Sequence, residues 1–245
     1  MSIAYSGISG RIGHFINKYR SPTSHVLDRS VFSWEDSGTY KSLRSYSCLF
    51  LSFPVNKINI LDFLPKVLSC IGPDQTVVKF GSLGPQRVIH DLIDGELRQK
   101  CRVISLQLAP TMQNIIDEQI NGNYLCDYRH GRPAPYVAPE DAAKIAVQAV
   151  EGTVTKDILS VTGAENLTIH QVQDLLAKYK TYKLKTIDTS VFRDQYQCYP
   201  IHILNQIGQC YDHYKTWNPE ASTDLVDNNI VPQTFGQWLE KYYAN

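Results

Sequence analysis

The sequence predicts an α/β protein with a doubly wound parallel sheet and a small, mainly helical lobe at its C-terminal end. Short apolar runs alternate with stretches of helical period, which is typical of a parallel sheet covered by helices on both faces. Glycines cluster at the first expected junction between a strand and a helix. No long linker or low-complexity tract divides the chain, so we expect the lobe, residues 153–245, to pack on the core, residues 1–152, within one domain.

The first part of the chain supplies most of the expected sheet. Strands are predicted at residues 2–6, 25–28, 31–34, 48–53, 76–80 and 102–108. Helices are predicted at residues 10–19, 58–71 and 85–100. Too few residues separate the second strand from the third for a parallel crossover, which needs about a dozen residues. We therefore expect the crossover helix to be missing at this point and the sheet to be trimmed.

Helices dominate the second part of the chain. A strand is predicted at residues 158–161, and helices at 140–150, 168–178, 201–214 and 234–243. A Pro/Gly-rich loop at 131–139 precedes the first of these helices, whose first turn holds Glu140 and Asp141, where the helix dipole favours acidic side chains. Thr168 is the expected N-cap of the next helix. Residues 123–136 form a candidate lid, since long polar loops often carry function.

The most informative motif is YSGISGRIGHF at residues 5–15. Gly7, Gly10 and Gly13 suit a tight turn, a close backbone approach and close packing of helix on strand, with amide groups facing a diphosphate at a helix N-terminus. Their spacing departs from G-x-G-x-x-G, and an ordinary tight turn is the alternative. Because the motif lies at the first strand–helix junction, it predicts a Rossmann-type dinucleotide pocket. The predicted cofactor residues of this turn also include Ser9, Arg11 and Ile12.

Arg29 follows the second expected strand, where a dinucleotide fold contacts the adenosine ribose. An acidic residue there favours the free 2′-hydroxyl of NAD(H), whereas an arginine suits the 2′-phosphate of NADP(H). We therefore expect NADP(H) as the cofactor. Because the acidic Asp28 lies next to Arg29, NAD(H) is the alternative cofactor. The alternative interpretation of Arg29 is a surface arginine without a binding role.

Ser82 and His90 are the candidate catalytic residues. Ser82 comes directly after the strand at 76–80 and His90 lies in the helix that follows, so both can face the crevice where open α/β sheets bind ligands. His90 is the candidate acid or base. A histidine that only packs on an amphipathic helix is the alternative.

Further motifs run along most of the chain. They are YSGISGRIG at residues 5–13, WEDSGTYKSLRSYSCLFLSFP at 34–54, VVKFGS at 77–82, LAPTMQNI at 108–115, YVAPEDAAKIAVQAV at 136–150, VTGAENLTIHQVQDLL at 161–176 and PQTFGQWLEKY at 232–242. In this order they resemble the NmrA-like branch of the atypical short-chain dehydrogenases. The resemblance places Asp36 in an acidic turn, and Phe53 and Pro54 on the phosphate side of the cofactor.

The resemblance implies a Rossmann core with a small C-terminal substrate lobe and NADP(H) binding. The activities that it implies range from quinone and imine reduction to redox sensing without turnover. Gln107 departs from the family, which usually has an arginine there, and the shortened second crossover affects the adenosine side of the pocket. The Tyr-x-x-x-Lys pattern of short-chain dehydrogenases occurs only in the lobe, at Tyr179 and Lys183 and at Tyr211 and Lys215. Both strings lie far from the helix where that mechanism needs them, so we interpret the spacing as chance.

The composition disfavours several kinds of partner. Lys and Arg total 24 and so do Asp and Glu, so no excess of positive charge favours a nucleic acid or an anionic membrane. The chain lacks the features of a signal peptide, and no apolar run approaches the roughly 20 residues of a membrane span, so we expect a cytoplasmic location. The six cysteines form no Cys-x-x-Cys pair and the histidines no metal spacing, so we expect reduced thiols and no metal site.

These observations favour an NAD(P)H-dependent oxidoreductase that reduces a small organic substrate, such as an imine, enone or quinone, in a biosynthetic pathway. The alternatives are an NADP-binding redox sensor without turnover and a cofactor-independent cyclase or isomerase on a relict Rossmann fold. A homodimer is the assembly that we consider. Aromatic side chains in the lobe are candidates for binding an aromatic or polycyclic substrate, with core packing as the alternative. They are Tyr196, Tyr199, Tyr211, Tyr214, Trp217, Trp238, Tyr242 and Tyr243.

Overall fold

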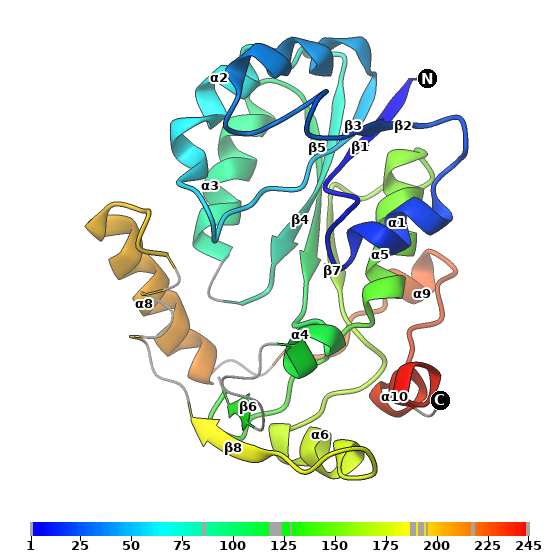
Figure 1. The fold of residues 1–245 in the computed structure, drawn as a ribbon, viewed down its shortest axis with the longest axis vertical. Coiled ribbons are helices and arrows are strands. Elements are labelled where there is room, and N and C mark those ends of the chain that lie inside the picture. The colour runs from blue at the N-terminus through cyan, green and yellow to red at the C-terminus, as the bar shows by residue number, and fades with distance from the viewer. Residues whose placement is uncertain are drawn as a thin grey trace.

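A six-stranded parallel sheet runs through the centre of the molecule (Figure 1). The computed structural model describes residues 2–84, 87–117, 124–127, 129–186, 190, 194, 196–216 and 219–243. In spatial order the strands are β2 (His25–Leu27), β1 (Ile3–Ser6), β3 (Cys48–Phe50), β4 (Thr76–Ser82), β5 (Arg102–Leu108) and β7 (Ile158–Val161). The predicted α/β fold with a Rossmann-type parallel sheet is therefore confirmed.

Helices cover both faces of this sheet (Figure 1). One face carries α1 (Gly13–Tyr19) and α5 (Pro139–Val150), and the other carries α2 (Leu64–Leu68) and α3 (Arg87–Arg98). Along β4, Val77 belongs to the apolar cluster of α2 and α3 and Val78 to that of α1 and α5, because successive strand side chains point to opposite faces. Burial of both faces explains why the central strands are continuous apolar runs.

The C-terminal lobe lies at the carboxyl ends of the strands (Figure 1). A second, two-stranded parallel sheet, β6 (Tyr124–Asp127) and β8 (Lys183–Thr186), belongs to it. The other elements here are α4 (Met112–Asp117), α6 (Ile169–Leu176), α8 (Ile201–Thr216), α9 (Asp224–Asp227) and α10 (Phe235–Tyr243). Residues of α4, β6, α6 and α10 share a third apolar cluster. The chain after residue 152 also supplies β7 to the main sheet, and a division at that residue stays a prediction.

The strand predicted at residues 31–34 is wrong. Asp28 Oδ1 accepts hydrogen bonds from Ser30 N at 2.8 Å and from Val31 N at 3.2 Å, and this turn redirects the chain directly after β2. The following residues lead into a 3₁₀ helix, η1 (Ser37–Ser45). Within residues 2–84, no α-helix lies between β2 and β3, and β2 is an edge strand. The expected absence of a crossover helix and the trimmed sheet agree with this arrangement, although the strand at 31–34 on which they were based is absent.

Two predicted helices differ in extent. The helix expected at 58–71 is replaced by a 3₁₀ turn, η2 (Ile60–Asp62), and by the short α2, because Pro65 lacks an amide hydrogen and takes a first-turn position of a new helix. Helix α1 begins at Gly13 rather than at residue 10, since residues 8–12 form turns and a bend. Strands β6 and β8 were not predicted, because the sequence KLKT of β8 is mostly exposed and lacks a clear apolar alternation.

The remaining elements follow the prediction closely. Strands β5 and β7 have the expected bounds, while β3 ends earlier, at Phe50, and β4 extends to Ser82. Thr168 caps α6 as expected, in a capping box with Gln171. Residues 85 and 86 of the helix expected at 85–100 lie outside the described residues. No helix in the described ranges combines the length and the apolar content that crossing a membrane requires.

Candidate active site

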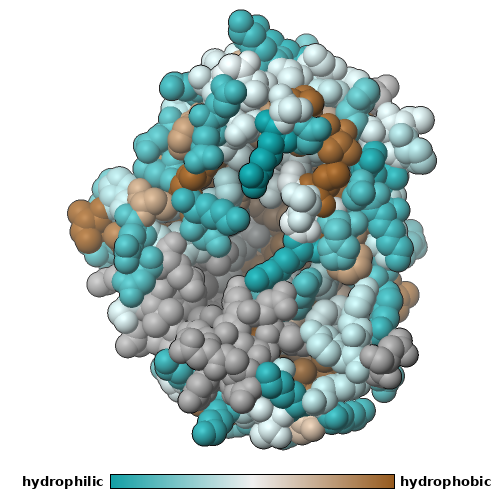
Figure 2. Space-filling view, viewed as in Figure 1, coloured by the Kyte–Doolittle hydropathy of each residue, from teal (hydrophilic) through white to brown (hydrophobic). Residues whose placement is uncertain are grey.

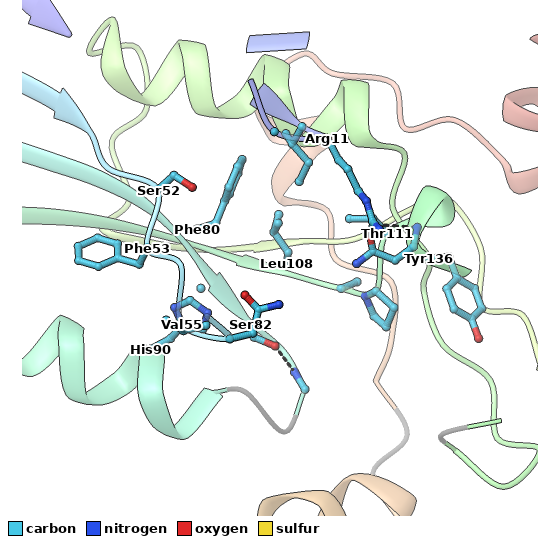
Figure 3. Close-up of a pocket in the computed structure, with 18 of the residues that line it drawn as sticks. Arg11, Ser52, Phe53, Val55, Phe80, Ser82, His90, Leu108, Thr111 and Tyr136 are labelled. Atoms are coloured by element: carbon cyan, nitrogen blue, oxygen red, sulfur yellow. Dashed lines mark hydrogen bonds between the residues drawn. The ribbon is translucent and has the colours of Figure 1, made fainter. Parts of the chain in front are cut away.

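A cavity of about 470 Å³ lies at the carboxyl ends of the central strands. Figure 2 shows the hollow on the face turned to the viewer, and Figure 3 shows the side chains around it. Its walls come from the turn between β1 and α1, the segment after β3, the ends of β4 and β5, and α4. Strand order reverses between β1 and β3, which is where open α/β sheets bind ligands. The volume is in the usual range for small-molecule pockets, about 300–1,000 Å³.

The glycine turn forms one wall of this cavity because bulkier residues do not fit it. Gly7 has φ +69°, and a Cβ on it would lie 2.5 Å from Ser52 Cβ. A Cβ on Gly13 would lie 2.1 Å from the carbonyl oxygen of Gly7. Gly10 N donates to that same oxygen at 3.1 Å, and no side chain caps the N-terminus of α1. The turn therefore presents bare backbone to the cavity, as a dinucleotide diphosphate requires.

The cavity brings together most of the residues predicted to bind a cofactor. Those that line it are Gly7, Gly10, Arg11, Ile12, Gly13 and Phe53. Ser9 and Pro54 do not line it, although each neighbours a residue that does. Arg29 lies outside the cavity and is exposed in the turn after β2. The carboxylate of Asp28 accepts hydrogen bonds from the backbone amide and the hydroxyl of Ser30 within this turn.

Trp34 packs against the segment that follows β3. Its indole Nε1 donates to the carbonyl oxygen of Ser52 at 3.0 Å, and its ring lies 4.8 Å from that of Phe53, centroid to centroid. These contacts hold the segment after β3 against residues 31–34. The described cavity thus extends from the glycine turn toward the lobe rather than toward Arg29.

Arg11 connects the glycine turn to the lobe side of the cavity. Its guanidinium donates to Asn114 Oδ1 of α4 at 2.9 Å, and both residues line the cavity. Thr111, which begins the turn into α4, is drawn beside this contact in Figure 3. Residues 108–115 therefore supply part of the cavity wall. The family resemblance included this segment, but no residue of it was predicted to lie in the site.

Ser82 and His90 both line the cavity, as the sequence predicts (Figure 3). Ser82 Oγ accepts a hydrogen bond from Gly84 N at 3.0 Å. His90 is buried, with 8% of its surface exposed, and its Nδ1 has no hydrogen-bond partner among the described residues. Burial, with a smaller effect of the Lys79 charge, lowers the pKa of His90 to about 3. The imidazole is therefore neutral at physiological pH and can donate or accept a hydrogen bond, but it is not a cation.

The far end of the cavity is built from the predicted lid segment. Asp127, Arg129 and Tyr136 line it, and Asp127 Oδ1 accepts a hydrogen bond from the backbone amide of Arg129 at 3.1 Å. Arg129 is 3% exposed, which is unusual for an arginine. Residues 123 and 128 of the segment lie outside the described residues. Composition suggested the segment, but no local pattern identified Asp127 or Arg129 as cavity residues.

The described aromatic residues of the lobe divide into three groups. Tyr196 lines the cavity, together with Phe50, Phe53, Phe80 and Tyr136 from the rest of the chain. Tyr199, Tyr211 and Trp238 are buried in the apolar interior, and Tyr242 and Tyr243 are partly exposed. The side chain of Tyr214, and Trp217 as a whole, lie outside the described residues.

Several residues singled out in the sequence do not reach the cavity. Neither Tyr-x-x-x-Lys string lines it, and Tyr211 instead packs under the Lys215 ammonium, 4.8 Å from the ring centroid. Gln107 in β5 is half-buried and lies outside the lining. Across the described ranges, no three His, Cys, Asp or Glu side chains are grouped as metal ligands.

Comparison with known proteins identifies solved structures that share this fold. The sequence matches no protein-family profile and no curated protein. The structure is similar to the NADPH-dependent quinone oxidoreductase QOR2 of Escherichia coli in complex with NADPH, with a TM-score of 0.73 and 12% identity over 98% of this chain and 99% of that chain. It is also similar to triphenylmethane reductase of Citrobacter sp., with a TM-score of 0.69 and 11% identity over 100% of both chains.

A plant enzyme extends the same comparison. Leucoanthocyanidin reductase of Vitis vinifera, solved as a binary complex with NADPH, has a TM-score of 0.67 and 10% identity over 100% of both chains. All three similarities extend over nearly the whole chain, lobe included. The fold that the sequence resemblance implies is confirmed: this chain has the Rossmann-type fold of these reductases.

Proposed function

We propose that this protein is an NADP(H)-dependent reductase of the NmrA-like, atypical short-chain dehydrogenase type, acting on a small organic substrate. The observation that carries the proposal is the glycine turn. Gly7 and Gly13 have no room for a Cβ, and the bare backbone they create faces a cavity at the point where strand order reverses. The whole-length similarity to reductases solved with NADPH supports the same function.

The residues present fit a bound dinucleotide. Gly10 and Ile12 face the diphosphate through their backbone, Arg11 contributes positive charge beside it, and Phe53 borders the neighbouring part of the cofactor, with Pro54 next to it in the chain. When bound, NADP(H) supplies or accepts a hydride. Arg29 is exposed and therefore accessible to a 2′-phosphate, which is the basis for proposing NADP(H) over NAD(H).

The cavity suits a flat, partly polar substrate. Aromatic side chains border it, and Ser82 and His90 add polar groups at the end of β4. We assign to Ser82 and His90 the task of orienting a substrate oxygen or nitrogen, and to Phe80 and Tyr136 packing against its rings. Imines, enones and quinones have this combination of a flat apolar body and one polar atom.

Binding of the four nicotinamide dinucleotides to the purified protein tests the proposal. In calorimetry we expect NADPH and NADP⁺ to bind more tightly than NADH and NAD⁺. Gly10→Asp should abolish binding, because it puts bulk and negative charge where the diphosphate approaches, whereas Gly95→Asp on the exposed surface of α3 should bind as the wild type does. Unchanged affinity in Gly10→Asp contradicts the placement of the diphosphate.

Turnover separates the reductase from a redox sensor. The sensor is favoured by one observation: the lining includes tyrosines but no lysine, so the described cavity lacks the tyrosine–lysine pair of short-chain dehydrogenases. NADPH oxidation in the presence of quinones, enones and imines decides between the two, since a sensor binds NADPH without consuming it. If none of the four dinucleotides binds, the oxidoreductase proposal fails in favour of a cyclase or isomerase. A cytoplasmic location, a biosynthetic role and a homodimer stay predictions.

A further inference from the structure

A fully buried lysine lies directly behind the cavity wall. Lys79 is on β4, 0% exposed, and its Nζ lies 2.6 Å from Asp94 Oδ1 of α3. The same Nζ donates a long hydrogen bond, 3.5 Å, to the backbone carbonyl of His90. Lys79 alternates with Val78, so it points to the face of the sheet that α3 covers. No local pattern predicts this pair, because a lysine in an apolar strand can also face the solvent.

His90 and Asp94 are arranged on α3 so that Lys79 contacts both. They are four positions apart and thus share one face of the helix. Asp94 is 8% exposed and holds the ammonium, while His90, one turn earlier, lines the cavity with its Nδ1 unpartnered among the described residues. An unpartnered ring nitrogen at a cavity wall is a group that a ligand can satisfy.

Burying the Lys79–Asp94 ion pair between the helix and the sheet has a high desolvation cost. Moving two charges out of water costs several kcal/mol per ion, and apolar residues of similar volume often serve equally well or better. Ile89, Ile93 and Leu97 already pack α3 against the sheet. Packing alone therefore gives no reason for an ion pair at this place, next to the one histidine in the cavity lining.

We propose that the Lys79–Asp94 pair is a positioning device that fixes the turn of α3 carrying His90, so that its imidazole hydrogen-bonds a carbonyl oxygen of the substrate. The inference rests on the proposed reductase function for its substrate but concerns residues that function does not assign. Lys79 and Asp94 touch no substrate and act only through His90. The nearby Lys79 charge also opposes protonation of the ring, which agrees with a hydrogen-bonding rather than a cationic role.

The charged groups around this histidine come from two sides. Lys79 faces it from β4, and Asp91, Asp94 and Arg98 lie along its own helix, within electrostatic range of Lys79. Among these, Asp91 pairs with Arg87 on the exposed surface at 3.0 Å. Asp91 is therefore a suitable control for loss of a carboxylate from α3 without loss of the buried pair.

The test compares the double variant Lys79→Met/Asp94→Leu with Asp91→Asn and with His90→Gln. The apolar pair should preserve the fold, which a thermal melt verifies. Nitrogen NMR of the imidazoles, with His90→Gln to assign the signal, should show one defined neutral tautomer of His90 in the wild type and in Asp91→Asn. The double variant should show a shifted, averaged signal. An unchanged His90 signal in the double variant overturns the inference.

Kinetics provide a second, independent readout with NADPH and 1,4-naphthoquinone as the probe. The double variant should lose at least about tenfold in kcat while the KM for NADPH changes by less than about twofold. When Lys79→Met/Asp94→Leu is added to His90→Gln, kcat should fall no further, because the pair acts through the His90 ring. Additive losses overturn the inference. If the wild type binds no dinucleotide, the proposed function fails, and the NMR comparison still decides whether the pair positions His90.

Discussion

Gly7 and Gly13 illustrate how single atoms decide the shape of the cofactor turn. The two glycines contact each other's backbone so closely that the methyl group of an alanine at Gly13 would overlap the carbonyl oxygen of Gly7. The neighbouring atom is backbone, so it cannot rotate away as a flexible side chain would. At Gly95 in α3, by contrast, a Cβ would meet nothing within 4 Å.

Alanine substitutions at these two glycines should have opposite effects on stability. Gly13→Ala should lower the free energy of unfolding by about 1–3 kcal/mol, because the turn must open to accommodate the methyl group. Gly95→Ala should raise it by about 0.4–1 kcal/mol, since it restricts the unfolded chain without a clash. Urea denaturation of both variants measures this. A neutral Gly13→Ala would mean that helix and turn are not packed as closely as described.

His90 should make stability depend on pH. Its pKa is about 3 in the folded protein, against a usual value near 6.5, so between these values the unfolded chain binds more protons. The contribution of the neutral His90 ring to the free energy of unfolding is therefore complete above about pH 6.5 and is lost as the pH falls toward 3. His90→Gln should reduce the slope of unfolding free energy against pH in this window by up to about 1.4 kcal/mol per unit. Equal slopes in both proteins would contradict a buried, neutral imidazole.

Among the contacts between elements, buried carboxylates at the N-terminus of α5 attach this helix to α10 and the residues before it. Glu140 is 1% exposed and accepts bonds from Lys241 Nζ at 2.6 and 2.8 Å. Asp141 Oδ2 accepts from the backbone amide of Gln233 at 2.8 Å. Burial raises the pKa of Glu140, but hydrogen bonds from Lys241, Tyr242 and Gln233 outweigh it and hold the pKa below its usual value. This network ties the C-terminal helix to the core helix that covers the sheet.

Lys241→Gln should weaken this attachment in a pH-dependent way. Loss of the ammonium leaves a buried carboxylate with fewer partners, and we expect unfolding free energy at pH 7 to fall by about 1–3 kcal/mol. The difference from wild type should shrink progressively as the pH falls below about 4.5, because Glu140 is then protonated in the unfolded chain and its stabilising contribution is lost as the pH falls on through its lowered folded pKa. Chemical denaturation at several pH values measures this.

Lys215→Gln serves as the matched control for that measurement. Lys215 forms a pair with Asp212 at 3.0 Å on the surface of α8, and removing it should cost less than about 1 kcal/mol at any of these pH values. An equal cost for the two lysine variants would contradict a special role of the buried Glu140.

At the scale of the whole molecule, the sheet ends and the lobe meet at the cavity. The Arg11–Asn114 hydrogen bond joins residues 103 positions apart and connects the two parts across the site. Arg11 belongs to the glycine turn, so under the proposed cofactor binding we expect its guanidinium to exchange the amide partner for a phosphate oxygen, which makes a stronger, charge-assisted bond.

Arg11→Gln should therefore weaken NADPH binding by about tenfold while leaving the fold unchanged. The affinity should also become less sensitive to added salt, because one charge contact is lost. Calorimetry at two salt concentrations measures both effects. Arg44→Gln, which alters an exposed arginine bound to the Ser69 carbonyl, should bind NADPH as the wild type does. Wild-type affinity in Arg11→Gln would place the diphosphate elsewhere.

Local patterns in the sequence determined the order of strands and helices, the glycine turn and the cap at Thr168. These features depend on residues a few positions apart, whose periodicity and backbone preferences act before any long-range contact forms. The absence of a crossover helix after β2 is also a local property, because it depends on the number of residues between β2 and the next apolar run. Ser82 and His90 were found because parallel strands bring their carboxyl ends to one edge.

Only the tertiary structure decided which of the other side chains reach the cavity. Trp34 packs against the segment after β3, Arg29 stays exposed, Lys79 is buried against Asp94, and Arg129 comes from the lid segment. None of these outcomes has a local signal, because each depends on which distant side chains pack together and on how much water they exclude. Charge and burial are properties of the assembled molecule, whereas the sequence alone specifies only the residues that can take part.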